Sequence, residues 1–299
     1  MPASHARRVQ YAQNFLHRRR LVTSLVAGSS LGPDDLVVEI GPGDGAITAV
    51  LLERCRHVIA VEKDPVQIER LDRRFAGEPR LTLFAADVLE FPLPHSPYKV
   101  FASIPYNATA AIVGKLTTGI APPEDIYLVV QREAAERVMG VPRETLAGLR
   151  IRPWFAPGIV HAFLQTDFRP IPAVDSVLLR LERRSRPLVE PSLRSRYEDL
   201  VSALFSAWQP TVREAVRKVL PRRAAGAVCS SFGGALDRKP GETGLETWIA
   251  VFDLLVDLDD ERVWQAIERA AATLKSEQSR LQKRHRSSLA SPAGNRRSR

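Results

Sequence analysis

The glycine-rich stretch at residues 39–45 is the strongest candidate for a ligand site in the sequence. It follows an apolar run at residues 36–38 and precedes residues 46–53, which have the pattern of a helix, so the glycines occupy a strand-to-helix turn. Glycine lets the backbone turn tightly and approach a ligand closely. The first turn of the helix offers unpaired N–H groups and a partial positive charge, which suit a carboxylate or a phosphate. The stretch therefore predicts a site for a nucleotide-like cofactor.

Two cofactor classes fit this loop equally well. Gly41, Gly43 and Ala46 match the dinucleotide fingerprint, and Glu62 lies where that fingerprint places an acid for the ribose. The same residues suit a methyl-donor cofactor, and a purely structural turn is a third interpretation. The loop alone leaves these alternatives open.

Strand-like and helix-like stretches alternate from residue 36 onward. Strands are expected at residues 36–40, 58–62, 81–85, 100–104 and 126–130, with helices such as residues 65–75 and 109–116 between them. Near-continuous apolar strands separated by amphipathic helices predict a parallel sheet covered on both faces. Residues 155–163 and 176–183 leave no room for a crossover helix, so we expect an antiparallel hairpin at the sheet edge. Seven strands in this order resemble the α/β fold of class I methyltransferases, a Rossmann-like, mostly parallel sheet.

Acidic residues follow two of the expected strands, at the edge where open α/β sheets bind their ligands. Glu62 ends the second strand and can accept hydrogen bonds from both hydroxyls of a ribose. Asp87 follows the third strand and can accept one from the exocyclic amine of adenine. A helix N-cap or a solvated loop acid is the alternative for each residue alone. The glycine loop beside them favours cofactor binding.

The fourth expected strand ends in Ser103-Ile104-Pro105-Tyr106, which suits the methylation of an adenine amine. That amine is a poor nucleophile because its lone pair is delocalised into the ring, and acceptors aimed at its two protons free the lone pair. Proline fixes the backbone and removes a donor, so nearby carbonyls can point into a pocket. Tyr106 can stack on a flipped base. A plain turn is the alternative for this tetrapeptide.

Taken together, these motifs resemble the rRNA adenine N6-dimethyltransferases. Within them the sequence is similar to the Erm family, which modifies large-subunit rRNA and confers resistance to macrolides, lincosamides and streptogramin B. The matching residues are Gln13-Asn14-Phe15-Leu16, Glu39-Ile40-Gly41-Pro42-Gly43-Asp44-Gly45, Glu62, Asp87, Ser103-Ile104-Pro105-Tyr106, Gln131 with Glu133, and Phe168-Arg169-Pro170-Ile171-Pro172-Ala173-Val174-Asp175-Ser176. The resemblance implies S-adenosyl-L-methionine as the cofactor in place of NAD.

The resemblance also implies a role for each matching position. The expected cofactor-binding residues are Asn14, Leu16, Gly41 at the methionine part, Gly43, Glu62 at the ribose, Asp87 at the adenine, and Ser103. The expected catalytic residues are Ser103, Ile104, Pro105, Tyr106 and Phe168, with Phe168 as the second wall of an aromatic clamp opposite Tyr106. No general base is expected, because positioning is the main catalytic device in transfer from a sulfonium.

Ser103 departs from the family, which usually has Asn at this position. Serine is shorter and offers a hydroxyl in place of an amide carbonyl. The acceptor role would then pass to the backbone carbonyl of Ile104 or to a water. Whether one or two methyl groups are transferred is left open by this departure.

Charge and cysteine content limit the partners. The 299-residue chain carries a formal charge of +9, which favours nucleic acid as the partner over a membrane surface. Cys55 and Cys229 lie far apart without metal-ligand spacing, so we expect neither a disulfide framework nor a metal site. The sequence shows no targeting segment and no run that could span a bilayer, which predicts a cytoplasmic protein. Nothing calls for more than a monomer.

A small α-helical C-terminal domain is expected beyond a boundary at residues 183–187. Helical apolar spacing marks residues 192–207, 212–219 and 247–255. Trp208, Trp248 and Trp264 are expected to be core anchors rather than base-stacking residues, because large aromatic side chains dominate small cores.

Basic residues of the C-terminal half suggest contact with RNA. A cluster is expected to contact the rRNA backbone, with a solvated face as the alternative: Arg213, Arg217, Lys218, Arg222 and Arg223. The expected organisation is a basic N-terminal segment that contributes to the cofactor site (residues 1–30), a methyltransferase domain (31–184), a helical rRNA-binding domain (185–267) and a basic, disordered tail (268–299) that attracts RNA non-specifically.

The predicted function is methylation of N6 of an adenine in 23S rRNA, in the peptidyl-transferase loop of domain V, with macrolide, lincosamide and streptogramin B resistance as the result. The expected substrate is protein-free rRNA or an early assembly precursor. A small-subunit (16S) rRNA adenine dimethyltransferase is the nearest alternative, because its glycine loop and Pro-Tyr motif are similar. A non-enzymatic RNA-binding factor on the same fold is an alternative from another class. DNA adenine methylation is disfavoured, since no added target-recognition domain is found.

Overall fold

The computed structural model describes residues 15–119 and 121–277, which form two compact units. Of the described residues, unit 1 comprises 15–119, 121–142 and 151–187, and unit 2 comprises 143–150 and 188–277. Asn14 and the basic run after residue 277 lie outside the described residues. The roles predicted for the separate domains stay predictions.

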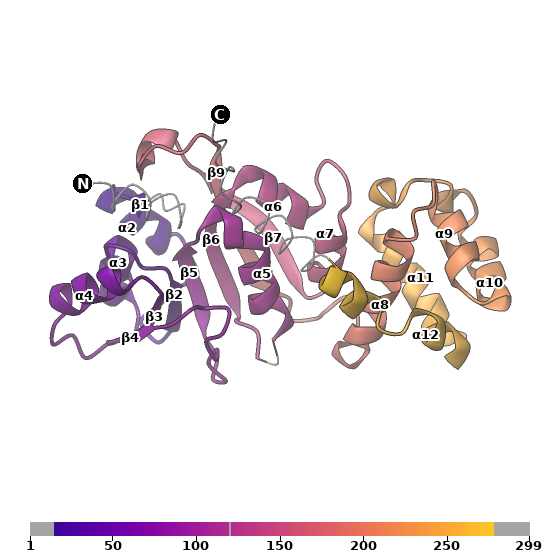
Figure 1. Cartoon of the computed structure of the whole chain (residues 1–299), viewed down its shortest axis with the longest axis horizontal. Helices are drawn as coiled ribbons and strands as arrows, with labels where there is room; N and C mark the ends of the chain where they lie inside the picture. Colours follow the sequence, from indigo (N-terminus) through magenta and orange to yellow (C-terminus); the bar gives the residue numbers. More distant parts are fainter. Residues whose placement is uncertain (1–14, 120, 278–299) are drawn as a thin grey trace, which may run out of the picture. The chain divides into compact units, whose positions relative to one another are not determined.

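Unit 1 is built on a seven-stranded sheet in the order β4-β3-β2-β5-β6-β9-β7 (Figure 1). The strands are β2 (Leu36–Ile40), β3 (His57–Glu62), β4 (Leu81–Ala85), β5 (Lys99–Ser103), β6 (Asp125–Gln131), β7 (Phe155–Ala162) and β9 (Ser176–Arg183). The first five strands run parallel, and β9 lies antiparallel between β6 and β7. The predicted α/β fold, a mostly parallel sheet with an antiparallel hairpin at its edge, is confirmed.

Three helices connect parallel strands: α3 (Ala46–Arg54) lies between β2 and β3, α4 (Pro65–Arg74) between β3 and β4, and α5 (Thr109–Thr118) between β5 and β6. The helix α2 (Arg19–Ala27) precedes β2 and α6 (Arg132–Met139) follows β6, whereas residues 86–98 join β4 to β5 without a helix. The chain proceeds from β2 outward to β4 and then returns to β5 on the other side of β2. The order of the strands therefore reverses between β2 and β5, which is where open α/β sheets form a ligand crevice.

A second, two-stranded sheet joins the N-terminal segment to the proline-rich motif. β1 (Phe15–Leu16) pairs antiparallel with β8 (Phe168–Arg169), and Leu16 lies opposite Phe168. Both of these side chains belong to the same buried core cluster as Val22, Val26 and Leu51. The pairing holds two motifs that are about 150 residues apart in the chain beside each other.

Polar side chains at the amino-terminal edge of the large sheet satisfy one another. The buried carboxylate of Asp125 accepts hydrogen bonds from the guanidinium of Arg180 (2.7 and 3.0 Å), from Ser30 Oγ (2.7 Å) and from Tyr127 Oη (3.2 Å). Lys99 Nζ donates to the backbone carbonyl of Ser30 (2.7 Å). A buried charge is stable only when it is paired in this way.

Unit 2 is helical (Figure 1). Its helices include α8 (Arg194–Phe205), α9 (Val212–Val219), α10 (Arg222–Phe232), α11 (Leu245–Asp257) and α12 (Glu261–Ile267), and α7 (Leu146–Ile151) contributes residues 146–150. The sequence predicted the helices near α8, α9 and α11 but not α7, α10 or α12. Within the described residues no helix has the length and apolar character needed to cross a membrane.

The three tryptophans of unit 2 differ in burial. Trp248 and Trp264 are 1% and 6% exposed and pack on Phe205 and Phe252, so their prediction as core anchors is confirmed. The prediction for Trp208 is wrong, because its side chain is 94% exposed. Helix α8 ends at Phe205, and Trp208 lies in the loop before α9 with a left-handed φ of 55°. The helical periodicity that would bury it stops before this position.

Candidate cofactor and substrate site

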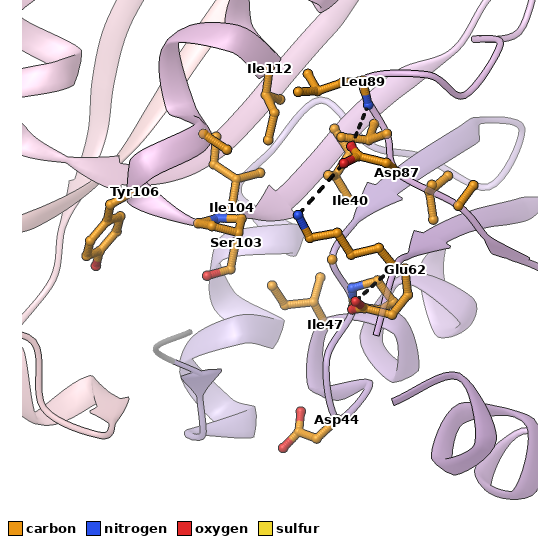
Figure 2. A pocket seen from close by; sticks show the side chains of 18 of the residues that line it. Ile40, Asp44, Ile47, Glu62, Asp87, Leu89, Ser103, Ile104, Tyr106 and Ile112 are labelled. Atoms are coloured by element: carbon orange, nitrogen blue, oxygen red, sulfur yellow. Dashed lines mark hydrogen bonds and ion pairs between the residues drawn. The ribbon is translucent and has the colours of Figure 1, made fainter. Parts of the chain in front are cut away.

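A pocket opens at the carboxyl edge of the parallel strands, where β2 and β5 diverge. Its empty space, including the open mouth, is about 970 Å³. Figure 2 shows Ser103, Ile104 and Tyr106 on one side of the pocket and Glu62 and Asp87 on the other. The structure thus brings together the ends of strands β2, β3, β4 and β5, as the sequence predicted.

The glycine loop adopts a backbone that other residues rarely tolerate. Gly41, Gly43 and Gly45 have φ values of 65°, 58° and 81°. A Cβ on Gly45 would lie 2.7 Å from Phe75 and 2.9 Å from Leu71, so Gly45 allows α4 to pack against the loop. Gly41 lines the pocket, whereas Gly43 is not among the residues that line it. Only part of the loop therefore faces a ligand.

Glu62 is held almost entirely by backbone N–H groups. The residue is 2% exposed. Its Oε1 accepts hydrogen bonds from the N–H groups of Lys63 and Asp64 (2.9 Å each), and its Oε2 accepts one from the N–H of Gly43 (3.3 Å). A carboxylate has about four lone-pair positions, so about one is left for a ligand. The sequence predicted that Glu62 accepts hydrogen bonds from both ribose hydroxyls, whereas this arrangement leaves room for only one of them.

Asp87 is held more loosely than Glu62. Its Oδ1 accepts from the N–H of Leu89 (2.9 Å), which is the turn contact expected of a loop acid. Its Oδ2 lies 3.8 Å from Lys63 Nζ, and its side chain is 41% exposed. Asp87 thus stabilises its own turn and still lines the pocket. Lys63, which also lines the pocket, was not predicted; its place directly after Glu62 at a strand end was the available signal.

Glu39 begins the glycine-rich stretch and links it to the following helix through a hydrogen bond. Its Oε2 accepts from Thr48 Oγ1 (2.6 Å), which joins the end of β2 to α3. Complete burial raises the pKa of the Glu39 carboxyl to about 8, and the nearby carboxylates of Glu62 and Asp44 act in the same direction. Glu39 therefore holds a proton at neutral pH. Glu39 belongs to the glycine-rich stretch, but the sequence pattern indicates no role for it.

The tetrapeptide after β5 forms the other wall. Ser103, Ile104, Pro105 and Tyr106 all line the pocket. Tyr106 begins a short 3-10 helix, and its Oη lies 2.6 Å from the Oγ of Ser176, which is buried at the start of β9. Seventy positions separate these two residues in the chain, and no local pattern in the sequence signals their contact.

Of the two residues of the predicted aromatic clamp, only Tyr106 is among those that line the pocket. Tyr106 lines the pocket, whereas Phe168 is 1% exposed and packs edge-to-face on Phe163 at 5.2 Å between ring centroids. Leu16, which lies opposite Phe168 in the small sheet, does line the pocket. The structure therefore places Phe168 in the core, behind a predicted cofactor residue.

The chemistry of the lining fits S-adenosylmethionine. Apolar side chains such as Ile40, Ile47 and Ile112 offer surfaces for a nucleoside, and the carboxylates of Glu62 and Asp87 offer acceptors to hydroxyl and amine groups. The positive φ of Gly41 allows close backbone approach by the polar end of the ligand. No group of three or more His, Cys, Asp or Glu side chains that could hold a metal ion occurs among the described residues.

Comparison with known proteins agrees with this chemistry. The family model for ribosomal RNA adenine dimethylase matches residues 4–240. The chain is 31% identical over 257 residues to the rRNA adenine N-6-methyltransferase of Saccharopolyspora erythraea, covering 85% of this chain and 67% of that protein. It is 32% identical over 262 residues to the ribosomal RNA small subunit methyltransferase A of Synechococcus sp. (strain JA-3-3Ab), covering 84% and 93%.

A solved structure supports the same assignment. The crystal structure of the 23S rRNA methyltransferase ErmE matches with a TM-score of 0.71 and 30% identity, covering 81% of this chain and 100% of that one. The family match extends over most of the chain and includes every predicted pocket residue. The chain therefore belongs to the ribosomal RNA adenine dimethylase family and is an S-adenosylmethionine-dependent rRNA adenine N6-methyltransferase.

Proposed function

We propose that this enzyme methylates N6 of an adenine in the peptidyl-transferase loop of 23S rRNA and confers resistance to macrolides, lincosamides and streptogramin B. The observation that carries the proposal is the likeness to a solved 23S rRNA methyltransferase over the whole of that solved chain. The basic C-terminal tail of the sequence and Ser103, which stands where the family usually has Asn, also favour it. The substrate would be protein-free 23S rRNA or an early precursor, and a monomer suffices.

The strand-end residues would hold the cofactor. Gly41 would meet its methionine part, Glu62 one ribose hydroxyl and Asp87 the adenine amine. Leu16, together with Asn14, would close the site from outside the large sheet. Gly43 would act through Glu62, because its N–H donates to that carboxylate. The cofactor supplies a methyl group on a positively charged sulfur.

The tetrapeptide wall would position the target base. Tyr106 would stack on a flipped adenine, and Ser103 with the carbonyl of Ile104 would accept from its amine. Pro105 fixes the backbone between them. As the N–C bond forms, the bond between the methyl carbon and sulfur would break and leave its electron pair on sulfur as a neutral thioether. The amine would release its surplus proton to solvent, so that orientation in the pocket is the chain's main contribution.

Phe168 has a supporting part in this proposal. Its ring packs edge-to-face on Phe163, and the residue is not among those that line the pocket. In its buried position it instead backs Leu16 through the pairing of β1 with β8. We therefore assign the stacking contact to Tyr106 alone.

The competing target is the small ribosomal subunit. A relative named as a small subunit methyltransferase matches at an identity similar to that of the large-subunit type. Family membership makes the chain an enzyme, so the non-enzymatic alternative is set aside.

Transfer of a labelled methyl group separates the two targets. Purified enzyme is incubated with tritiated S-adenosylmethionine and with protein-free 23S rRNA, large subunits or small subunits, and the labelled nucleosides are identified. Label in 23S rRNA is expected. Label confined to small subunits would overturn the proposal. The ratio of one-methyl to two-methyl adenosine, compared with that of Ser103→Asn, then reports what the serine does.

A further inference from the structure

We propose that Trp208 and the basic side chains beside it form a docking surface for a single-stranded segment of the rRNA substrate, with Trp208 stacking on an unpaired base. The proposal rests on rRNA as the substrate but not on which ribosomal subunit supplies it. It assigns the contact to unit 2 and is independent of the methyl-transfer pocket.

The exposure of Trp208 is the first observation. The side chain is 94% exposed, whereas the other three tryptophans of the chain, Trp154, Trp248 and Trp264, are 5%, 1% and 6% exposed. Burying an aromatic side chain of this size is strongly favourable. A protein that leaves one in water on a well-formed loop forgoes that stability, and a ligand that covers the ring would recover it.

The backbone at Trp208 is the second observation. Its φ of 55° lies in the left-handed region, which is strained for a residue with a large side chain. The loop around it is fixed at both ends. The N–H of Ser206 donates to the carbonyl of Ser202 (3.1 Å), and Thr211 caps α9 through the N–H of Glu214. A strained conformation on a fixed loop presents the ring in one direction and limits the entropy that stacking would cost.

Positive charge beside the loop is the third observation. Lys218 Nζ, from the last turn of α9, donates to the carbonyl of Ala207 (3.0 Å) and so ties that helix to the residue before Trp208. Arg217, Arg222 and Arg223 follow on α9 and α10 and are exposed. Arg213 is occupied by Asp237 and the carbonyl of Gly233.

The charge of this segment is one-sided. Between Asp199 and Asp237 the sequence contains a single acid, Glu214, against five basic residues. An aromatic platform beside arginines is the combination that binds single-stranded nucleic acid: the ring stacks on a base, and the guanidinium groups contact phosphates. A protein partner would need no such excess of positive charge.

Intrinsic fluorescence tests the stacking directly. Because the other tryptophans are buried, Trp208 should dominate the solvent-exposed emission of the full-length protein. A short oligoadenylate should quench this emission, and a duplex of the same length should quench it much less. The quench should vanish in Trp208→Phe, which keeps the ring for stacking but removes the reporter. Equal quenching by the duplex, or no quenching by the oligoadenylate, would overturn the proposal.

Affinity measurements separate stacking from charge. Trp208→Ala should weaken oligoadenylate binding about tenfold at both low and high salt, and Trp208→Phe should retain most of the affinity. Arg222→Ala should weaken binding mainly at low salt and lower the salt slope by about one. Arg70→Ala, which removes an exposed charge on α4 in unit 1, is the control and should have little effect.

Two further results would count against the proposal. If Trp208→Ala leaves RNA affinity unchanged but abolishes self-association in sedimentation, the ring belongs to a protein interface. If Arg70→Ala weakens binding as much as Arg222→Ala, the attraction is a general charge effect. Methyl transfer is scored separately: RNA-dependent quenching with no label in 23S rRNA would leave this surface intact and refute only the proposed target.

Discussion

At the amino-terminal edge of the large sheet, the carboxylate of Asp125 accepts hydrogen bonds from three side chains, those of Arg180, Ser30 and Tyr127. At the carboxyl edge of the same sheet, the carboxylate of Glu62 accepts from three backbone N–H groups. Both residues are nearly inaccessible to solvent. Their donors differ in kind, and so does what each carboxylate can do.

Side-chain donors surround Asp125 and leave no path for a ligand, so that edge contributes stability. Backbone donors approach Glu62 from the loop below it and leave the pocket side open. Because the backbone is fixed by the fold, the carboxylate is held in place before any ligand arrives, which reduces the cost of binding. Buried acids on one sheet thus divide into a structural network and a preorganised site.

Removing the acid of the amino-terminal edge should give the largest effect on stability. Asp125→Ala removes the acceptor shared by Arg180, Ser30 and Tyr127, although Arg180 keeps its ion pair with Glu182. It should lower the free energy of unfolding by about 3 kcal/mol. Urea denaturation measures this. Glu53→Ala, which breaks the exposed pair with Arg19, is the control and should cost less than about 0.5 kcal/mol. Similar losses of unfolding free energy in the two variants would show that the Asp125 network contributes no more stability than an exposed ion pair.

Truncating the aromatic wall of the carboxyl edge should affect activity and not the fold. Tyr106→Ala should lower kcat/KM for rRNA about 30-fold, because the loss of base stacking removes about 2 kcal/mol of transition-state stabilisation. The affinity for S-adenosylmethionine, measured by calorimetry, should stay within about twofold. A large loss of cofactor affinity would mean that Tyr106 belongs to the cofactor half of the pocket.

Glu39 should make stability depend on pH. The ordinary pKa of a glutamate carboxyl is 4.5, whereas burial raises the pKa of Glu39 in the folded protein to about 8, so between these values the folded state keeps a proton that the unfolded state has lost. The free energy of unfolding should therefore fall as pH rises, by at most about 1.4 kcal/mol per pH unit. Glu39→Gln, neutral at every pH, should flatten the dependence measured by urea denaturation. Parallel curves for the two proteins would contradict this assignment.

The bond between Tyr106 and Ser176 should have the smallest effect. Ser176→Ala and Tyr106→Phe should each lower kcat/KM about fivefold, which corresponds to about 1 kcal/mol of transition-state stabilisation, since each removes the same hydrogen bond. The double variant should lose no more than either single one, because the two residues act as one unit. Additive losses would show that Ser176 acts elsewhere than through the tyrosine ring.

The sequence predicted the sheet well because each parallel strand is a short, nearly continuous apolar run. The expected limits of β2, β4 and β9 agree with the structure, and those of the others differ by one residue at either end or both. The strand-end acids followed from the same pattern, since their positions depend only on where a strand stops. Local signals were sufficient for these features.

Contacts between distant segments could not be predicted in this way. The pairing of Tyr106 with Ser176 depends on how β9 is inserted beside β6. The burial of Phe168 depends on its place behind Leu16. Trp208 was predicted to be buried because its hydrophobicity favours a core. It lies instead on an exposed loop with a left-handed backbone, and the residue type gives no sign of that conformation.

We propose that the carboxyl-edge pocket holds the cofactor while the amino-terminal edge only supports the fold. Calorimetric titration of S-adenosylmethionine into the wild-type protein, Glu62→Gln and Asp125→Asn tests this division, because each variant neutralises one buried acid at one edge. Glu62→Gln should weaken binding by about 2 kcal/mol, or about 30-fold. Asp125→Asn, although less stable, should bind within about twofold of the wild type. Unchanged binding by Glu62→Gln, or an equal loss in both folded variants, would contradict it.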